Sequence, residues 1–192
     1  MSRIPPLSPA QMNESQRRIC DEILRTRSGA WFHGPYDALL LQPSLAAPAQ
    51  ELGRFVRFDT SLEPRLSELA ILIVARHWDC DFEWHQHAPL ATHAGISAAD
   101  VEALRAGVKP PTLKDDEHVV LHFVTSLLKQ HRITDSDYHK AQTLLSVVGV
   151  VELTGLIGYY TFLAFTLLAH EISLPEGAEP PVRPSGSSAS GS

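Results

Sequence analysis

Apolar residues recur every three to four positions along most of the chain, which is the period of an α-helix. The segment 114–130 is a clear case, with one apolar face made by Val120, Phe123, Val124, Leu127 and Leu128. No stretch alternates apolar and polar residues for long enough to indicate a β-strand. The pattern therefore predicts an all-α protein of about seven to nine helices.

Capping residues, glycines and prolines predict where these helices begin and end. Ser8 and Pro9 precede the first helix, Pro43 separates two short helices, and Gly53 ends the second of them. The helices that we expect cover 11–27, 36–41, 44–52, a segment that Ser61 opens, a segment that Asp79 caps and Gly95 ends, 97–107, 114–130, 134–145 and a long segment from 147.

The segment from Leu153 to Ala169 contains no charged residue over 17 positions. This length is at the lower limit for a membrane span, and the segment lacks a flanking basic cluster. A helix that is apolar on every side can also be buried inside a protein or an oligomer. We therefore expect a buried helix, no membrane partner and assembly of the chain into a homo-oligomer.

Composition limits the class of protein. The chain has 192 residues, of which 44% are hydrophobic and 20% charged, and its net charge is −6. An acidic chain is a poor partner for nucleic acid, which requires a basic surface. Cys20 and Cys80 give no disulfide framework, and no secretory signal is visible at the N-terminus, so we expect a cytoplasmic protein.

We expect one main folded domain with two flanking segments. Residues 1–30 would form an N-terminal helical extension and residues 31–174 the helical domain. Residues 175–192 include the sequence PPVRPSGSSASGS and would form a disordered tail, because proline, glycine and serine cannot bury a core.

The stretch from Arg65 to Gly95 carries the densest chemistry in the chain. Cys80, Glu83 and His87 are spaced i, i+3 and i+7, which places them on one helix face, and Glu68 lies on the preceding helix. A carboxylate beside an imidazole can transfer protons near neutral pH. The alternative is that Glu83 and His87 form only a solvated surface pair.

The neighbours of these residues have two interpretations each. A helix N-terminus would favour a Cys80 thiolate, and nearby acidic residues would oppose it. The other interpretation of Cys80 is an inert, buried thiol. Trp78, Phe82 and Trp84 would form either an apolar wall around the site or ordinary core. His77, Cys80, Glu83 and His87 are metal-ligand types, but one helix stripe rarely completes a tetrahedral site, so we expect no metal and no cofactor.

This stretch resembles the carboxymuconolactone decarboxylase / alkylhydroperoxidase D-like superfamily. In that pattern a Glu is followed twelve residues later by Cys-x-x-Cys and then by a His, and Glu68, Cys80, position 83 and His87 fall on this spacing. The resemblance covers about residues 34–168 and includes the turn Ala94-Gly95-Ile96-Ser97. It implies the alkylhydroperoxidase D-like helical fold and a trimer or a hexamer.

The chain departs from the family pattern at Glu83, where the second cysteine would stand. The resemblance therefore favours the decarboxylase branch, with His87 as proton donor oriented by Glu68 or Glu83. Cys80 is a further candidate at the catalytic site, and the candidates for substrate binding are Trp84, Arg65 and Arg76.

Two alternatives remain open. One is a peroxidase that uses Cys80 without an adjacent resolving cysteine. The other is a non-catalytic member of the family that acts as a binding module.

Overall fold

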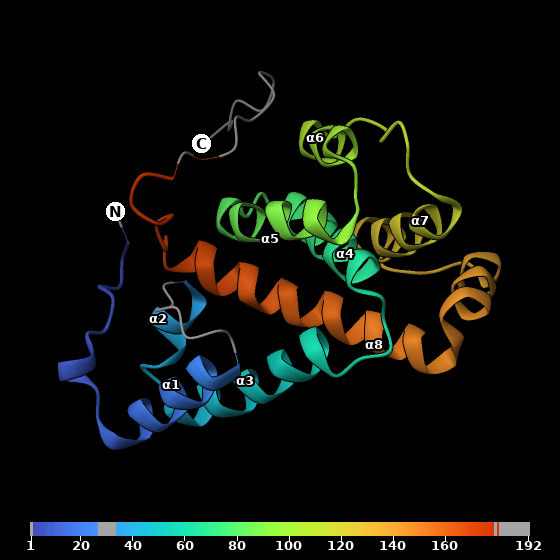
Figure 1. Cartoon of the computed structure of the whole chain (residues 1–192). Coiled ribbons are helices and arrows are strands. Elements are labelled where there is room, and N and C mark those ends of the chain that lie inside the picture. The colour runs from blue at the N-terminus through green and yellow to red at the C-terminus, as the bar shows by residue number, and fades with distance from the viewer. Residues whose placement is uncertain (1, 27–33, 179, 181–192) are drawn as a thin grey trace.

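The computed structural model describes residues 2–26, 34–178 and 180. Within these ranges the chain is all-helical, as predicted, with no strand (Figure 1). The elements are the 3₁₀ turn Pro9–Gln11 and the helices α1 Glu14–Thr26, α2 Pro35–Leu39, α3 Pro43–Phe58, α4 Pro64–His77, α5 Asp81–Ala94, α6 Ala98–Ala106, α7 Asp115–Gln130 and α8 Asp135–Ala169.

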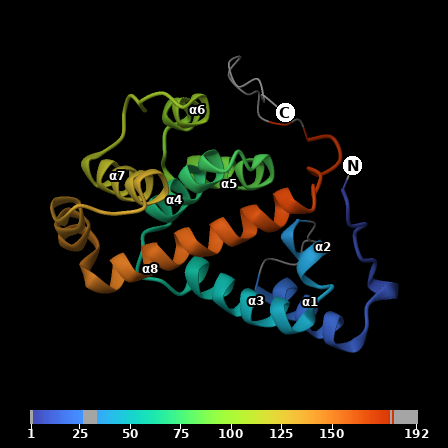
Figure 2. The same cartoon turned by 180° about the vertical axis from the view of Figure 1, so that it is seen from behind.

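Helix α8 runs through the middle of the molecule and separates two groups of helices. Helices α1, α2 and α3 lie on one side of it and α4, α5, α6 and α7 on the other, in both views (Figures 1 and 2). Helix α8 contacts α2, α3, α4 and α7. Its residues Leu153, Leu156 and Leu163 are buried in the main core together with side chains from both groups. The candidate site lies where α4, α5 and α8 meet.

Helix α4 is the most buried element on the α5 side. Every residue from Leu66 to Ala75 is buried except Glu68, which is partly exposed. A carboxylate in such a setting loses hydration and is stable only with partners of its own. The position of Glu68 within an otherwise apolar helix therefore marks it as a residue with a specific contact.

Several helix ends follow the local capping signals. The Ser97 hydroxyl accepts a hydrogen bond from the Asp100 amide, and the Thr134 hydroxyl accepts one from the Asp137 amide. Gly95 ends α5 in the left-handed region at φ 109°. These three boundaries confirm the predictions made for them, because each depends on a side chain or backbone preference within the same turn.

Three other boundaries correct the predictions. Gly53 does not end a helix but lies inside α3, and Ser61 does not cap α4 but donates its hydroxyl to Glu152 of α8. Asp79 adopts φ 50°, and Cys80 takes the N-cap position of α5 in its place. Gly53 is needed where it is, since a Cβ there would lie 2.6 Å from Cζ of Tyr159 on α8.

The predicted break between two C-terminal helices appears as a kink in α8. Ser146 has φ 66° and ψ 173°, which is not helical, although the helix continues on both sides. Among the described residues α8 is the one helix long and apolar enough to cross a membrane, with a mean hydropathy of 1.6 over an 18-residue window. Half of that window is buried within the protein, so α8 acts as a core helix here.

Residues 27–33, at the end of the first predicted helix and just after it, and nearly all of the predicted tail lie outside the described residues. The division of the chain at residues 30 and 174 stays a prediction.

Candidate active site

The structure brings together three of the residues singled out in the sequence. Nδ1 of His87 on α5 lies 2.6 Å from Oε2 of Glu68 on α4, and Nε2 of His87 lies 3.4 Å from Oε2 of Glu83, one turn earlier on α5. The side chains of His87 and Glu83 are only 5% and 6% exposed. The pair is therefore not a solvated surface pair, and each imidazole nitrogen faces a carboxylate.

Arg57 at the end of α3 adds a second cation to this group. Its Nη2 lies 3.9 Å from Oε1 of Glu68, and its side chain is 22% exposed. Its guanidinium also lies 5.2 Å from the centre of the Phe58 ring. With an imidazolium at His87, the two cations and the two carboxylates balance, which lowers the cost of burying four charges. We refer to Arg57, Glu68, Glu83 and His87 as the charged cluster.

The two carboxylates control the protonation of His87. Burial disfavours the imidazolium, but hydrogen bonds and charge from Glu68 and Glu83 outweigh burial and raise the pKa of His87 above its ordinary value. Loss of that proton would leave an uncompensated negative charge in a buried place. His87 is therefore held as a proton donor near neutral pH, with Glu68 fixing its orientation.

Aromatic residues of α8 hold the imidazole from the other side. The rings of Tyr160 and His87 are 5.0 Å apart and nearly perpendicular, and Tyr159 lies 5.5 Å from Tyr160 in the same geometry. The hydroxyls of Tyr159 and Tyr36 are 3.2 Å apart, which links α8 to α2. Sequence reasoning missed Arg57 and Tyr160 as site residues. The Tyr-Tyr pair in an apolar helix was the available signal for Tyr160.

Cys80 has a different environment from the charged cluster. It is buried with Phe82 and with Ala164 and Leu167 of α8. Burial raises the pKa of the Cys80 thiol to about 12; the backbone amides of Glu83 and Phe82 oppose this shift, and the charges of Glu83 and Asp81 add to it. The thiol is therefore protonated at neutral pH. Both Cys20 and Cys80 are free.

Trp78 and Trp84 pack in the core. Trp84 is buried in the main hydrophobic cluster, and Trp78 packs against both clusters and donates its indole N–H to Thr161 at 3.3 Å. The role of Trp84 in substrate binding stays a prediction.

Arg65 and Arg76 are both engaged in ion pairs. Arg65 binds Asp116 at 2.5 Å and also Glu117 and Glu63, and Asp116 and Glu117 raise its pKa. Arg76 pairs with Asp79 and donates from Nε to the Arg105 carbonyl at 2.9 Å. Substrate binding by either residue stays a prediction, and both side chains stabilise contacts between helices.

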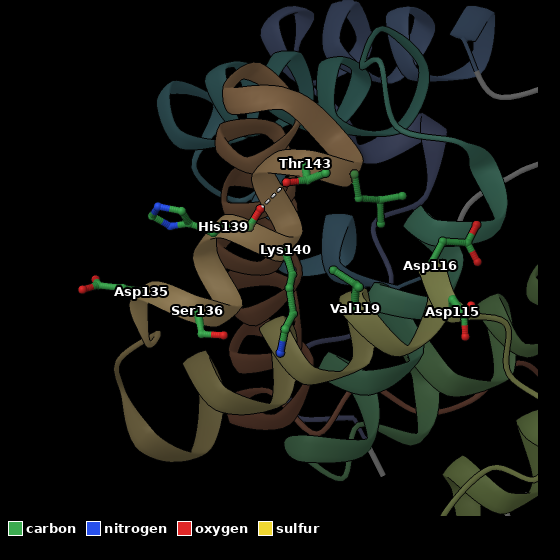
Figure 3. A pocket seen from close by; sticks show the side chains of 9 residues that line it. Asp115, Asp116, Val119, Asp135, Ser136, His139, Lys140 and Thr143 are labelled. Atoms are coloured by element: carbon green, nitrogen blue, oxygen red, sulfur yellow. Dashed lines mark hydrogen bonds between the residues drawn. The ribbon is translucent and has the colours of Figure 1, made fainter.

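Three cavities lined by described residues lie away from the charged cluster. Figure 3 shows one of about 800 Å³ between α7 and the start of α8, where Lys140 and Val119 point toward the same space. A second of about 700 Å³ lies beside α4 and α7, and a third of about 270 Å³ is lined by Cys80 and the end of α8. Within the described ranges no three or more His, Cys, Asp or Glu residues are arranged to hold a metal ion.

Comparison with known proteins gives a family match for part of the chain and a fold for most of it. The model of the carboxymuconolactone decarboxylase family matches residues 43–118, and no curated protein matches the chain in sequence. The debrominase Bmp8 in its apo form is similar, with a TM-score of 0.71, 14% identity and coverage of 90% of this chain and 92% of that one.

A Cys-to-Ala variant of Bmp8 in complex with 2,3,4-tribromopyrrole is also similar, with a TM-score of 0.70, 13% identity and coverage of 90% and 91%. The segment that matches the family model contains all four residues of the charged cluster. This segment therefore matches the carboxymuconolactone decarboxylase family, and the chain shares the alkylhydroperoxidase D-like fold of Bmp8.

Proposed function

We propose that this chain is a cofactor-free acid/base enzyme that decarboxylates a carboxylated lactone, or transfers a proton on a similar small acid. The observation that carries the proposal is the buried imidazole of His87 between the carboxylates of Glu68 and Glu83. A proton donor held charged near neutral pH is what such a reaction needs, because the carbon left behind by CO₂ must be protonated.

The steps follow from this arrangement. The bond between the ring carbon and the carboxylate breaks, its electron pair moves into the conjugated lactone carbonyl, and CO₂ leaves. His87 gives its proton to the carbon as the electron pair returns, and solvent restores that proton. Glu68 stabilises the imidazolium before transfer and keeps the ring in one orientation. The rate contribution of such a donor is typically about 10²- to 10⁴-fold.

A carboxylated substrate also needs a cation at the site. Arg57 is partly exposed at the edge of the charged cluster, so its guanidinium can contact a substrate carboxylate while it stays beside Glu68. This contact would hold the substrate in place and would be lost when CO₂ departs. We therefore assign Arg57 to substrate binding in this proposal, and no cofactor is required.

The peroxidase alternative has weaker support. A thiol reacts with peroxide as the thiolate, and the pKa of Cys80 is raised to about 12 by burial. The similar structure of a debrominase was obtained with a small brominated ring, which supports a small-molecule substrate but not a particular reaction. A non-catalytic binding module would have no need for a buried, charge-balanced imidazole, because burying four charges costs stability.

The test is turnover of a carboxylated lactone, with γ-carboxymuconolactone as the probe. Release of CO₂ and incorporation of deuterium from D₂O into the product would be measured for the wild type, His87→Gln and His85→Gln. His85 is a matched control, since it lies on the same helix outside the charged cluster. We expect His87→Gln to lower kcat by about 10²- to 10⁴-fold and His85→Gln to leave it unchanged.

Equal turnover by wild type and His87→Gln would contradict the role of His87. Absence of CO₂ release from the wild type, together with rapid peroxide consumption that Cys80→Ser abolishes, would favour the peroxidase alternative.

We further propose that the chain acts in the cytoplasm as a homo-oligomer, a trimer or a hexamer. Val148 and Val151 of α8 are 63% and 66% exposed, and Leu52 and Phe55 of α3 are also exposed. Apolar side chains grouped on helices are typical of subunit interfaces. Sedimentation at micromolar concentration would test this, with Val151→Lys expected to dissociate the assembly. A monomeric wild type would contradict it.

A further inference from the structure

A cavity of about 700 Å³ between α4, α7 and the segment after α6 has no part in the proposed reaction. Its apolar lining comes from Ile73 on α4, Leu104 on α6, Val108 and Pro110 in the following segment, and Leu121 and Leu128 on α7. In Figure 1 these elements lie together on the side of the molecule away from α3. We call it the α4–α7 cavity. Its volume is within the usual range for small-molecule pockets.

The polar lining of the α4–α7 cavity has one sign of charge. Three of its fourteen lining residues are cationic and none is acidic: the cations are Arg76, Lys109 and Lys129, and His77, His118 and His122 add imidazole groups. This contrasts with the whole chain, in which Asp and Glu number 22 against 16 Lys and Arg. A concave site lined by one sign of charge concentrates ions of the opposite sign.

Acidic groups near this lining neutralise only part of it. Asp79 pairs with Arg76, Asp100 lies near His118, and Asp137 lies near His122. Lys129 is close enough to His77 to help burial lower the pKa of that imidazole. Lys109 and Lys129 are exposed at the rim, so their ammonium groups are the cations most available to a ligand.

We propose that the α4–α7 cavity binds a small organic carboxylate with an apolar chain. The carboxylate would lie between the Lys109 and Lys129 ammonium groups, with the imidazoles of His118 and His122 as further hydrogen-bond donors. The apolar part would lie against Ile73, Leu104 and Leu128. The site is separate from the charged cluster, and the proposal holds whether or not the chain is a decarboxylase.

A matched pair of probes separates charge from apolar burial. Octanoate and 1-octanol have the same chain and differ in charge, and their binding to the full chain would be measured by calorimetry. Methyl NMR shifts would locate them, with the methyl groups of Ile73, Leu104 and Leu121 as reporters. We expect octanoate to shift these methyl groups and to bind more tightly than octanol. Decanoate should bind up to about fourfold more tightly for each added methylene that is buried.

Variants test the two halves of the site. Lys109→Gln with Lys129→Gln should weaken octanoate by about five- to thirtyfold and leave octanol unchanged. Lys140→Gln is the matched control, since Lys140 is an exposed lysine in a different cavity. Thr125→Phe should fill the cavity and reduce binding of both probes. His87→Gln should leave octanoate binding unchanged.

Equal affinity for octanoate and octanol would overturn the proposal. So would insensitivity of octanoate binding to the double lysine variant. Shifts confined to methyl groups outside the α4–α7 cavity, lost in His87→Gln, would assign the carboxylate to the catalytic site.

Discussion

His87 of the charged cluster, on α5, and Cys80, at the N-cap of α5, are seven residues apart but have opposite chemistry. His87 faces Glu68, Glu83 and Tyr160, and its ionised form is stabilised. Cys80 lies with Ala164 and Leu167, one to two turns farther along α8, and its neutral form is stabilised. Cys80 and His87 belong to the same i, i+3, i+7 series on one helix face, but they contact different residues of α4 and α8. Tertiary packing therefore decides which of the reactive side chains on one helix stripe is ionised.

The thiol side of this comparison gives the largest expected effect. The pKa of Cys80 is about 12, whereas that of an ordinary thiol is 9.0. At the same pH the thiolate fraction of Cys80 is therefore about 10³-fold smaller than that of an ordinary thiol. In a Cys20→Ser background at pH 8, iodoacetamide should therefore modify native Cys80 at least about 10³-fold more slowly than the urea-unfolded chain. Mass spectrometry of the adduct measures both rates. Equal rates would show that Cys80 is accessible and ionised.

The next largest effect is expected from substituting one residue in each environment and measuring turnover. Glu68→Gln removes the carboxylate 2.6 Å from Nδ1 of His87 and should lower turnover of γ-carboxymuconolactone by about 10²-fold, because the imidazolium loses its partner. Cys80→Ala should leave kcat within about threefold of the wild type, because the thiol takes no part in proton transfer. Activity that depends on Cys80 but not on Glu68 would reverse the assignment.

Some features of the fold and the site could be predicted from the sequence, and others could not. The caps at Ser97 and Thr134 and the glycine at Gly95 were predicted because each acts within its own turn. The meeting of Glu68 with His87 was expected from two adjacent helices and a family spacing. Arg57 was missed, since it reaches Glu68 from α3 and no local pattern records that contact.

Gly53 illustrates why the remaining features could not be predicted. Within a helical pattern a glycine reads as a helix end, yet Gly53 lies inside α3 because the Tyr159 side chain of α8 occupies the space of a Cβ. The two residues are 106 positions apart in the chain. Polar and aromatic contacts of this kind depend on the packing of whole helices, which local periodicity does not specify.

The contact between Gly53 of α3 and Tyr159 of α8 gives a smaller prediction, which concerns stability. Gly53→Ala should push α3 away from Tyr159 and lower the free energy of unfolding by about 1–3 kcal/mol, as overpacking does. Gly158→Ala is the matched control, because nothing lies within 4 Å of its added methyl group. It should be neutral or raise stability by about 0.5–1 kcal/mol, since alanine favours a helix. Urea unfolding of both variants measures the difference, and equal effects would contradict the close approach.

The smallest expected effect is the pH dependence of stability, which distinguishes the two environments directly. The pKa of His87 is raised in the folded chain, so the native state holds its proton more tightly than the unfolded state does. This stabilisation is complete below the ordinary histidine pKa of 6.5 and is lost as pH rises through the raised value. Cys80 also has a raised pKa, but its contribution is lost only above pH 9.0, where an unfolded thiol ionises.

Between pH 6.5 and 9.0 the charged cluster changes its protonation, whereas Cys80 keeps its proton. The free energy of unfolding should fall as pH rises from 6.5 toward 9, with a slope of at most about 1.4 kcal/mol per pH unit for one proton. Asp100 and Asp116, whose pKa values are lowered, stay ionised across this range in both states and add no slope. The slope should be reduced in His87→Gln and retained in His85→Gln and Cys80→Ala. A wild type and His87→Gln with the same slope would show that His87 is not held charged by Glu68 and Glu83, and the proton donor would then have to be sought elsewhere in the chain.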